Sequence, residues 1–256
     1  GGKGLNQSIA LAAGGAHVHH AGKVGEDGLW LIELLKRKKV KTDLVQIDAG
    51  PSGHANIQVT PEGENSIVLF GGANRKIDKK DVDRALEAED YEFLLIQNEI
   101  SSLDYLIKQA ADRGIKIIFN AAPMTAAVHD LPLALIELLI INELEGAALT
   151  GEDEPDKIVS SVLKNYPSTR ILLTLGQKGA WYADSLGIQK QAAEKVSAVD
   201  TTGAGDTFTG FFVAKYAKGD PIKESLKFAC RAAAISITRP GAASSIPDID
   251  EVNNLS

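Results

Sequence analysis

The sequence predicts an α/β fold in which a mostly parallel sheet is covered by helices on both faces. Short apolar strands, such as residues 93–97 and 115–119, alternate with helical segments over most of the chain. Strands that are apolar along their whole length are typical of parallel sheets buried on both faces. Polar residues and glycines follow these strands, at the sheet edge where such folds bind ligands.

The first third of the chain begins this alternation and then interrupts it. Apolar runs and helical periodicity predict a helix over 6–13, a strand over 16–24, a helix over 27–38 and a strand over 44–47. Residues 54–60 then alternate in polarity, 61–65 form a turn, and 66–70 form a second strand. This pattern indicates a β-hairpin that projects from the main sheet.

The remaining two thirds return to alternating helices and strands. Strands are expected over 93–97, 115–119, 138–141 and 171–174, with a small hairpin around 183–185. Helices are expected over 79–88, 102–113, 143–149, 155–165, 206–218 and 221–238, with a last one after Pro247. Between 120 and 137 the pattern gives only a poorly defined helical piece that Pro132 interrupts.

Composition excludes several classes of protein. The net charge of −7 disfavours nucleic acid and anionic membranes as main partners. No apolar run approaches the roughly 20 residues needed to cross a bilayer. The single cysteine, Cys230, excludes an intramolecular disulfide and suits a reducing compartment. We therefore expect a cytoplasmic protein.

The residues that follow the predicted strands share a polar or glycine-rich character. They are Asn98-Glu99, Asn120, Asn142 to Glu145, Leu175 to Gly179 and Thr202 to Asp206. Each taken singly is explained by a helix cap or a turn. Together, on one edge of one sheet, they indicate a nucleotide site with a metal.

The segment Thr202-Gly203-Ala204-Gly205-Asp206 opens an apolar helix. A glycine-rich turn at a helix start leaves backbone N–H groups free at the positive end of the helix dipole, which favours an anion. Asp206 is unusual in an anion site unless it handles a proton beside the anion. The alternative is that Asp206 only caps the helix.

Four motifs resemble those of the ribokinase-like (phosphofructokinase-B) carbohydrate kinases. They are GGKGLNQ at 1–7, GKVGED at 22–27, NELE at 142–145 and DTTGAGD at 200–206. Their order and spacing fit this family along nearly all 256 residues. The form of the first motif is most similar to that of the ribokinase branch.

The resemblance implies one domain over 1–256, a three-layer sandwich with a small β-lid and often dimerisation through that lid. The hairpin of residues 53–71 fits as part of the lid. Family members begin with a strand upstream of the first motif, followed by lid strands and an Asn-x-Asp element that holds the sugar. The N-terminal strand and part of the lid are therefore expected to be missing here, which leaves activity open.

The activity that the resemblance implies is ATP-dependent phosphorylation of a sugar's primary hydroxyl, with D-ribose giving D-ribose 5-phosphate. It makes Asp206 the general base and the amides of Gly203, Ala204 and Gly205 the anion site. The implied sugar ligands are Gly2, Lys3, Gly4, Asn6, Glu99 and Asp206.

The resemblance also implies ATP, Mg²⁺ and a monovalent cation such as K⁺. Mg²⁺ would lie near Asn142 and Glu145. The nucleotide would contact Asn142, Thr174, Leu175, Gly176, Gln177, Lys178, Gly179, Gly205 and Cys230. The monovalent cation would be held mostly by backbone carbonyls at Asp200, Thr202, Ser236, Arg239, Gly241 and Ser245. For Cys230, a buried and unreactive thiol is an equal alternative.

Other functions remain as alternatives. The substrate could be another sugar, such as fructose, or a nucleoside. A non-catalytic sugar or nucleotide binder would explain the missing N-terminal elements. A zinc site at His17, His19 and His20 is disfavoured because no further Cys or His lies at ligand spacing. A dinucleotide-dependent dehydrogenase is disfavoured because no glycine fingerprint follows the first strand.

Overall fold

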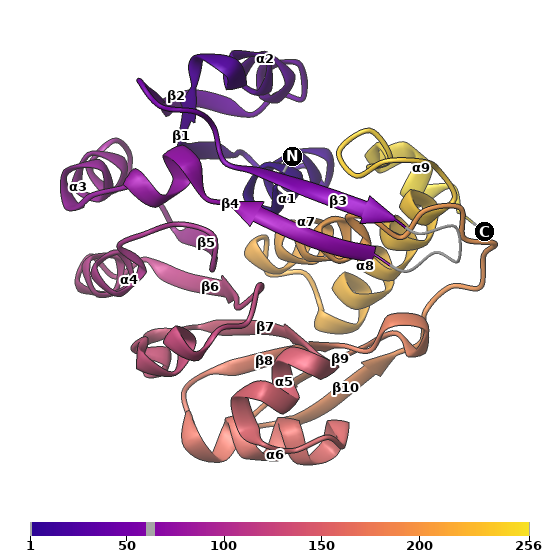
Figure 1. Cartoon of the computed structure of the whole chain (residues 1–256). Coiled ribbons are helices and arrows are strands. Elements are labelled where there is room, and N and C mark those ends of the chain that lie inside the picture. The colour runs from indigo at the N-terminus through magenta and orange to yellow at the C-terminus, as the bar shows by residue number, and fades with distance from the viewer. Residues whose placement is uncertain (1, 60–64, 256) are drawn as a thin grey trace.

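A six-stranded sheet runs through the middle of the structure, a computed structural model that describes residues 2–59 and 65–255 (Figure 1). Its strand order is β10-β9-β8-β7-β6-β5. The strands are β5 (Phe93–Gln97), β6 (Lys116–Asn120), β7 (Leu138–Asn142), β8 (Arg170–Thr174), β9 (Ala180–Asp184) and β10 (Gly187–Gln191). Strands β5 to β8 are parallel, whereas β9 and β10 are antiparallel, so the predicted mostly parallel sheet is confirmed.

Helices cover both faces of this sheet, which gives the predicted three layers (Figure 1). One face carries α1 (Lys3–Ala13), α7 (Ala204–Ala217) and α8 (Ile222–Ile237), with α9 (Ile249–Asn253) packed on α8. The other carries α3 (Lys79–Glu87), α4 (Leu103–Asp112), α5 (Glu143–Thr150) and α6 (Pro155–Asn165). Each face has its own apolar core.

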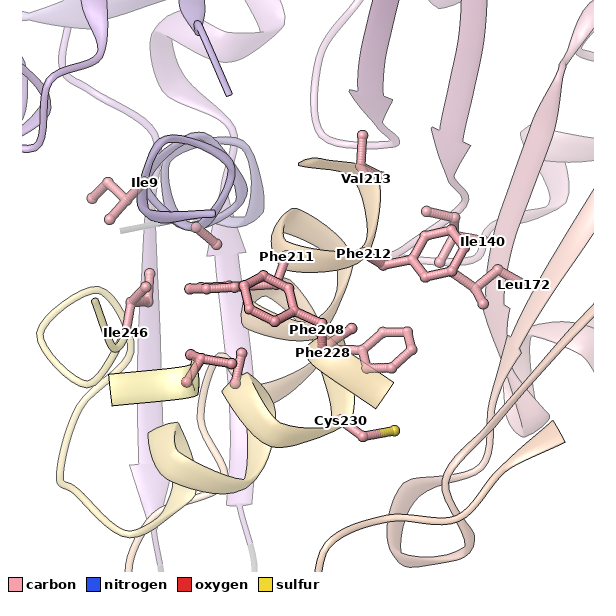
Figure 2. Packing of buried hydrophobic residues seen from close by; sticks show 14 of the residues in the cluster. Ile9, Ile140, Leu172, Phe208, Phe211, Phe212, Val213, Phe228, Cys230 and Ile246 are labelled. Carbon is pink, nitrogen blue, oxygen red and sulfur yellow. The ribbon is translucent and has the colours of Figure 1, made fainter. Parts of the chain in front are cut away.

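The strands serve both cores because successive side chains point to opposite faces. In β6, Ile118 packs in the core under α7, whereas Ile117 and Phe119 pack in the core on the opposite face. Figure 2 shows Phe212 of α7 beside Ile140 and Leu172 of the sheet. Helix α7 lies between the sheet, α1 and α8, and this explains why it is apolar nearly all round.

The first two strands form a separate parallel pair instead of joining the main sheet. They are β1 (His19–Gly25) and β2 (Lys41–Asp48). Helix α2 (Leu29–Arg37) lies on the connection between them. A cavity of about 670 Å³ is lined by β1, β2 and β5 together with parts of α1 and α3. The sequence pattern alone gave no sign of this division, because periodicity does not specify which strands pair.

The predicted hairpin is confirmed as β3 (His54–Val59) paired with β4 (Asn65–Phe70). It forms its own two-stranded sheet, apart from the main one. The turn expected over 61–65 lies outside the described residues except for Asn65. Apolar side chains of β4 are exposed, including Leu69 at 60% and Phe70 at 48%.

Most predicted boundaries agree with the structure, and the differences have local causes. Helix α1 begins at Lys3 rather than at residue 6, with Gly2 as its N-cap residue at a φ of 99°, a backbone conformation that glycine adopts readily. The predicted strand over 16–24 begins at His19. The poorly defined piece around Pro132 consists of two short 3₁₀ turns, Ala126–Asp130 and Leu133–Leu135. None of the helices within the described residues combines the length and apolar character that crossing a bilayer requires.

Candidate active site

Strand register brings the predicted polar residues to one edge of the sheet. Gln97 of β5 lies opposite Asn120 of β6, and Asn142 of β7 lies opposite Thr174 of β8. Because these residues end four parallel strands, they share the carboxyl edge. Helices α1 and α7 meet this edge from one face, and α5 starts directly from it at Glu143.

The start of α7 is built from two glycines with different roles. Gly203 caps the helix at a φ of 76°, and a Cβ there would lie 2.9 Å from the Cβ of Ala242. Both the conformation and the close approach require glycine. A Cβ on Gly205 would meet nothing within 4 Å. The backbone at Gly205 therefore faces open space, with the first N–H groups of α7 left without intrahelical partners.

That open space is a cavity of about 130 Å³ at the carboxyl edge of the sheet. It is bordered by the N-terminal ends of α5 and α7 and contains one lysine and two acidic side chains. Its lining is Lys3, Asn120, Ala122, Ile140, Ile141, Asn142, Glu145, Thr174, Gly203, Gly205, Asp206 and Thr209. Two helix N-termini and an ammonium group favour an anion there.

Asp206 lies at this cavity and is 7% exposed. Its Oδ2 accepts a 2.9 Å hydrogen bond from Nδ2 of Asn6, and its Oδ1 accepts one of 2.9 Å from Nε2 of Gln7. Asp206 is thus held by α1 rather than by the first amides of its own helix. Sequence reasoning missed Gln7; it lies next to Asn6 in the first motif, but spacing gave no reason to aim both side chains at residue 206.

Glu99 follows β5 and reaches the start of α1, where Oε2 accepts a 2.9 Å hydrogen bond from the backbone N–H of Lys3. Burial raises the pKa of Glu99, and the bond from Lys3 opposes that effect. A Cβ on Gly2 would lie 3.6 Å from Oε2 of Glu99, which is an ordinary contact, so the φ of 99° rather than a lack of space favours glycine at this position. The structure therefore brings together Gly2, Lys3 and Glu99, three of the residues that the resemblance implies as sugar ligands.

Asn142 and Glu145 form a reciprocal capping box at the start of α5. The N–H of Glu145 donates to Oδ1 of Asn142 at 2.8 Å, and the N–H of Asn142 donates to Oε2 of Glu145 at 2.9 Å. Burial raises the pKa of Glu145. In the described ranges, no three His, Cys, Asp or Glu side chains are grouped to hold a metal. These two residues therefore fit Mg²⁺ only in the manner typical of that ion, which keeps waters and takes phosphate oxygens.

Of the residues predicted for the monovalent cation, Thr202 and Gly241 meet at the side chain of Asp200. Its Oδ1 accepts from the N–H of Thr202 at 2.9 Å, and its Oδ2 accepts from the N–H of Gly241 at 2.8 Å. The hydroxyls of Ser236 and Ser245 donate to nearby carbonyls of Ala233 and Ala242, and Arg239 forms an ion pair with Glu251. Residues 200–202 and 241 thus lie side by side next to the start of α7.

The predicted nucleotide loop follows β8. Leu175 is buried, residues Gly176–Lys178 form one 3₁₀ turn, and Gly179 has a φ of 100°. Lys178 pairs with Glu143 at 3.2 Å. Cys230 lies instead in the apolar core, 5% exposed, where burial raises its pKa to about 12 (Figure 2). Its surroundings are those of the buried, unreactive thiol that the sequence allowed as an alternative.

A protein-family model described as pfkB family carbohydrate kinase matches residues 1–249. The chain belongs to this family. The resemblance of the four motifs to those of the pfkB carbohydrate kinases is therefore confirmed at the level of the family.

Its relatives and structural neighbours include several ribokinases. The ribokinases of Schizosaccharomyces pombe and Bacillus subtilis are each 37% identical to this chain and match 99% and 100% of it, over 85% and 87% of their own lengths. Ribokinase of Arabidopsis thaliana in complex with ribose and ATP matches with a TM-score of 0.88 at 31% identity, over 100% of this chain and 86% of that one. Cryptococcus neoformans ribokinase with ADP matches with a TM-score of 0.89 at 33% identity, over 99% and 87%.

Proposed function

We propose that this carbohydrate kinase transfers the γ-phosphoryl group of ATP to the primary hydroxyl of D-ribose, giving D-ribose 5-phosphate and ADP. The observation that carries the proposal is the position of Asp206. Its buried carboxylate borders the same small cavity as Lys3 and the free amides of α7. A base next to an anion site is what transfer of a phosphoryl group to an alcohol requires.

In this proposal each carboxylate oxygen of Asp206 accepts one side-chain amide and keeps a lone pair for the substrate. The sugar hydroxyl gives its proton to Asp206 as its oxygen attacks phosphorus, and the bond from phosphorus to the ADP oxygen breaks. The amides at Gly203, Gly205 and Asp206 stabilise charge on the transferring group, and the ammonium of Lys3 adds to that field. The N–H of Ala204, which was expected to join them, donates instead to the carbonyl of Thr201 at 3.2 Å.

The sugar is proposed to bind beside Asp206, between Asn6 and Glu99 at the start of α1. Within the described residues, Oδ1 of Asn6 is buried and has no hydrogen-bond partner. A buried acceptor of this kind costs free energy unless a ligand supplies a donor, and a sugar hydroxyl does so. The adjacent backbone is that of Gly2, Lys3 and Gly4. Because glycine has no side chain, the sugar can approach this backbone closely.

The cofactor sites are part of the same proposal. Asn142 and Glu145 would hold Mg²⁺, which when bound would supply positive charge to the phosphate groups. Residues 174–179 hold the nucleotide. Backbone carbonyls around Asp200, Thr202, Ser236, Arg239, Gly241 and Ser245 hold the monovalent cation, whose charge supports the anion site at the start of α7.

We also propose a homodimer formed through the β3–β4 hairpin in the cytoplasm. The exposed apolar side chains of Val68, Leu69 and Phe70 support an interface at this hairpin. Replacing Leu69 and Phe70 by serine should shift the protein toward monomer in sedimentation-velocity runs. An unchanged dimer, or a monomeric wild type, would contradict the lid interface.

The substrate is tested with a panel of D-ribose, 2-deoxy-D-ribose, D-fructose and adenosine, measuring ADP release with ATP and Mg²⁺. We expect the highest kcat/KM with D-ribose and a product phosphorylated on its primary hydroxyl by ³¹P NMR. 2-Deoxy-D-ribose is included because a deoxyribokinase of Salmonella typhi is 32% identical over 99% of this chain. A higher kcat/KM with another member of the panel would reject D-ribose as the preferred substrate. Binding of D-ribose without turnover would favour a non-catalytic binder.

The role of Asp206 is tested with Asp206→Asn, which keeps the shape but removes the base. The kcat should fall by about 10²–10⁴ with an intact thermal transition. Asp104→Asn is the matched control, because Asp104 also lies in the first turn of a helix but is exposed and pairs with Lys108. Unchanged turnover of Asp206→Asn would reject the proposed mechanism.

A further inference from the structure

Two glutamine side chains lead from the sheet to Asp206. Nε2 of Gln97 donates to Oε1 of Gln7 at 2.7 Å, and Nε2 of Gln7 donates to Oδ1 of Asp206 at 2.9 Å. Gln97 ends β5, Gln7 lies in α1 and Asp206 lies in α7, so the chain of bonds joins three elements. Both bonds are donated in the same direction, toward the carboxylate.

The direction matters because a glutamine amide has nearly the same shape whichever way it is turned. Its hydrogen-bond partners decide whether the oxygen or the nitrogen faces a given neighbour. Gln7 is 0% exposed, so its polar atoms depend on partners inside the protein. Because Gln97 donates to the oxygen of Gln7, the amino group of Gln7 is the part that faces Asp206.

This orientation acts on a base that changes its hydrogen-bonding character. An ionised Asp only accepts hydrogen bonds, whereas a protonated Asp also donates one. A glutamine free to turn would offer its oxygen to the protonated acid and stabilise the form that cannot act as a base. With Gln97 holding that oxygen, Gln7 remains a donor and favours the ionised form.

We propose that Gln97 and Gln7 are positioning residues for the phosphoryl transfer, which fix the donor side of the Gln7 amide toward Asp206 and keep its carboxylate ready to take a proton. This rests on the proposed function, in which Asp206 is the base. Neither glutamine needs to touch the sugar or ATP, and neither was among the site residues that the family resemblance implied.

Other charged groups also face Asp206. Lys3 of α1 and Glu145 of α5 line the same cavity, and Glu99 after β5 interacts with Asp206 electrostatically. All three are unchanged in the variants below, so their effect on the pH profile is common to every protein compared.

The decisive variant is Gln97→Glu, measured as kcat for D-ribose against pH. The new carboxylate only accepts, so it takes the amino group of Gln7 and turns the Gln7 oxygen toward Asp206. We expect the acid limb of the kcat profile to move up by about one pH unit, a roughly tenfold loss on that limb, with little change on the plateau. Gln97→Met, which removes the donor without adding an acceptor, should give a smaller shift in the same direction.

Two comparisons separate this mechanism from a simple charge effect. Gln189→Glu adds the same charge at an exposed position of β10 and should leave the acid limb in place. In a Gln7→Met background, Gln97→Glu should have no further effect, since the coupling passes through Gln7. Thermal unfolding of every variant establishes that the compared proteins are folded.

A readout that needs no turnover is the side-chain amide of Gln7 in ¹H–¹⁵N NMR, assigned by its loss in Gln7→Met. Its chemical shift should depend on pH in the wild type, and the midpoint of that dependence should rise in Gln97→Glu. The positioning role is overturned if Gln97→Glu leaves both midpoints unmoved, or if it moves the acid limb of the kcat profile by the same amount in the Gln7→Met background, where the Gln7 amide signal is absent. If Asp206→Asn is inactive and Gln97→Glu leaves the pH midpoints in place, only the positioning role is rejected. If Asp206→Asn remains active, the proposed base itself is rejected.

Discussion

The side-chain amide of Asn6 donates a 2.9 Å hydrogen bond to Oδ2 of Asp206, 200 residues further along the chain. The bond is buried, and it joins α1, at the start of the chain, to α7, near its end. In the proposed mechanism a base held in this way does not have to reorganise when the substrate arrives, which is the property that preorganised catalytic sites share. The proposal therefore gives the packing of α1 on α7 a role in activity as well as in stability.

Gly205→Val should remove activity without unfolding the protein. A Cβ at this position meets nothing within 4 Å, so the side chain is tolerated but occupies the space where the transferring group is proposed to lie. We expect kcat to fall by about 10²–10³, the size of effect seen when one anion-stabilising donor is lost, with a thermal midpoint close to wild type. Near-normal ribose phosphorylation by Gly205→Val would place the anion site elsewhere.

Gly203→Ala should act mainly on stability instead. The residue has a φ of 76°, and its new Cβ would lie 2.9 Å from that of Ala242. Backbone strain of this kind costs on the order of 1–3 kcal/mol, so the midpoint of chemical denaturation should fall clearly. The pair of glycines thus serves as an internal comparison, and an equal loss of stability in both variants would contradict their different roles.

Glu99→Gln should raise KM for the sugar while leaving the protein as stable or more stable at neutral pH. Burial raises the pKa of Glu99, so the folded state loses stability as the pH rises through that raised value and the carboxyl ionises. Glutamine avoids this cost. The advantage of the variant should shrink as the pH is lowered, which denaturation at several pH values would measure. Glu92→Gln, at an exposed ion pair with Lys116, is the control and should leave KM unchanged.

His20 should make the protein sensitive to mild acid. Burial lowers its pKa from 6.5 to about 4, and Ser8 hydrogen-bonds its Nδ1 at 2.8 Å. Because the folded pKa is below the unfolded value, the stability that the neutral ring contributes is present above pH 6.5 and is lost as the pH falls toward 4. The loss amounts to at most about 3 kcal/mol.

Denaturation between pH 7 and 4 measures this effect in wild type and in His20→Gln. The variant should show a flatter dependence over that window, whereas His129→Gln, at an exposed position, should follow the wild type. If the free energy of unfolding falls equally with pH in wild type and in His20→Gln, the imidazole of His20 does not control the acid sensitivity.

Local features of the sequence were sufficient for most of the fold. Apolar strands, helical periodicity and glycine or proline breaks depend on neighbours only a few residues away, so they located nearly every strand and helix. The same holds for part of the site: Asn142 and Glu145 are three residues apart, and one helical turn brings them into a capping box. The start of α7 likewise follows from the glycines around Ala204.

Only the tertiary structure decided what lies between distant segments. It separated β1 and β2 from the main sheet, placed Cys230 in the core, and aimed Gln7 at Asp206. Gln97 and Gln7 are 90 residues apart, and their bond depends on how α1 packs against the end of β5. A periodic pattern records which face of an element is buried but not which element covers it. For that reason the motifs pointed to Asp206 as the proposed base, whereas the residues that hold its carboxylate emerged only from packing.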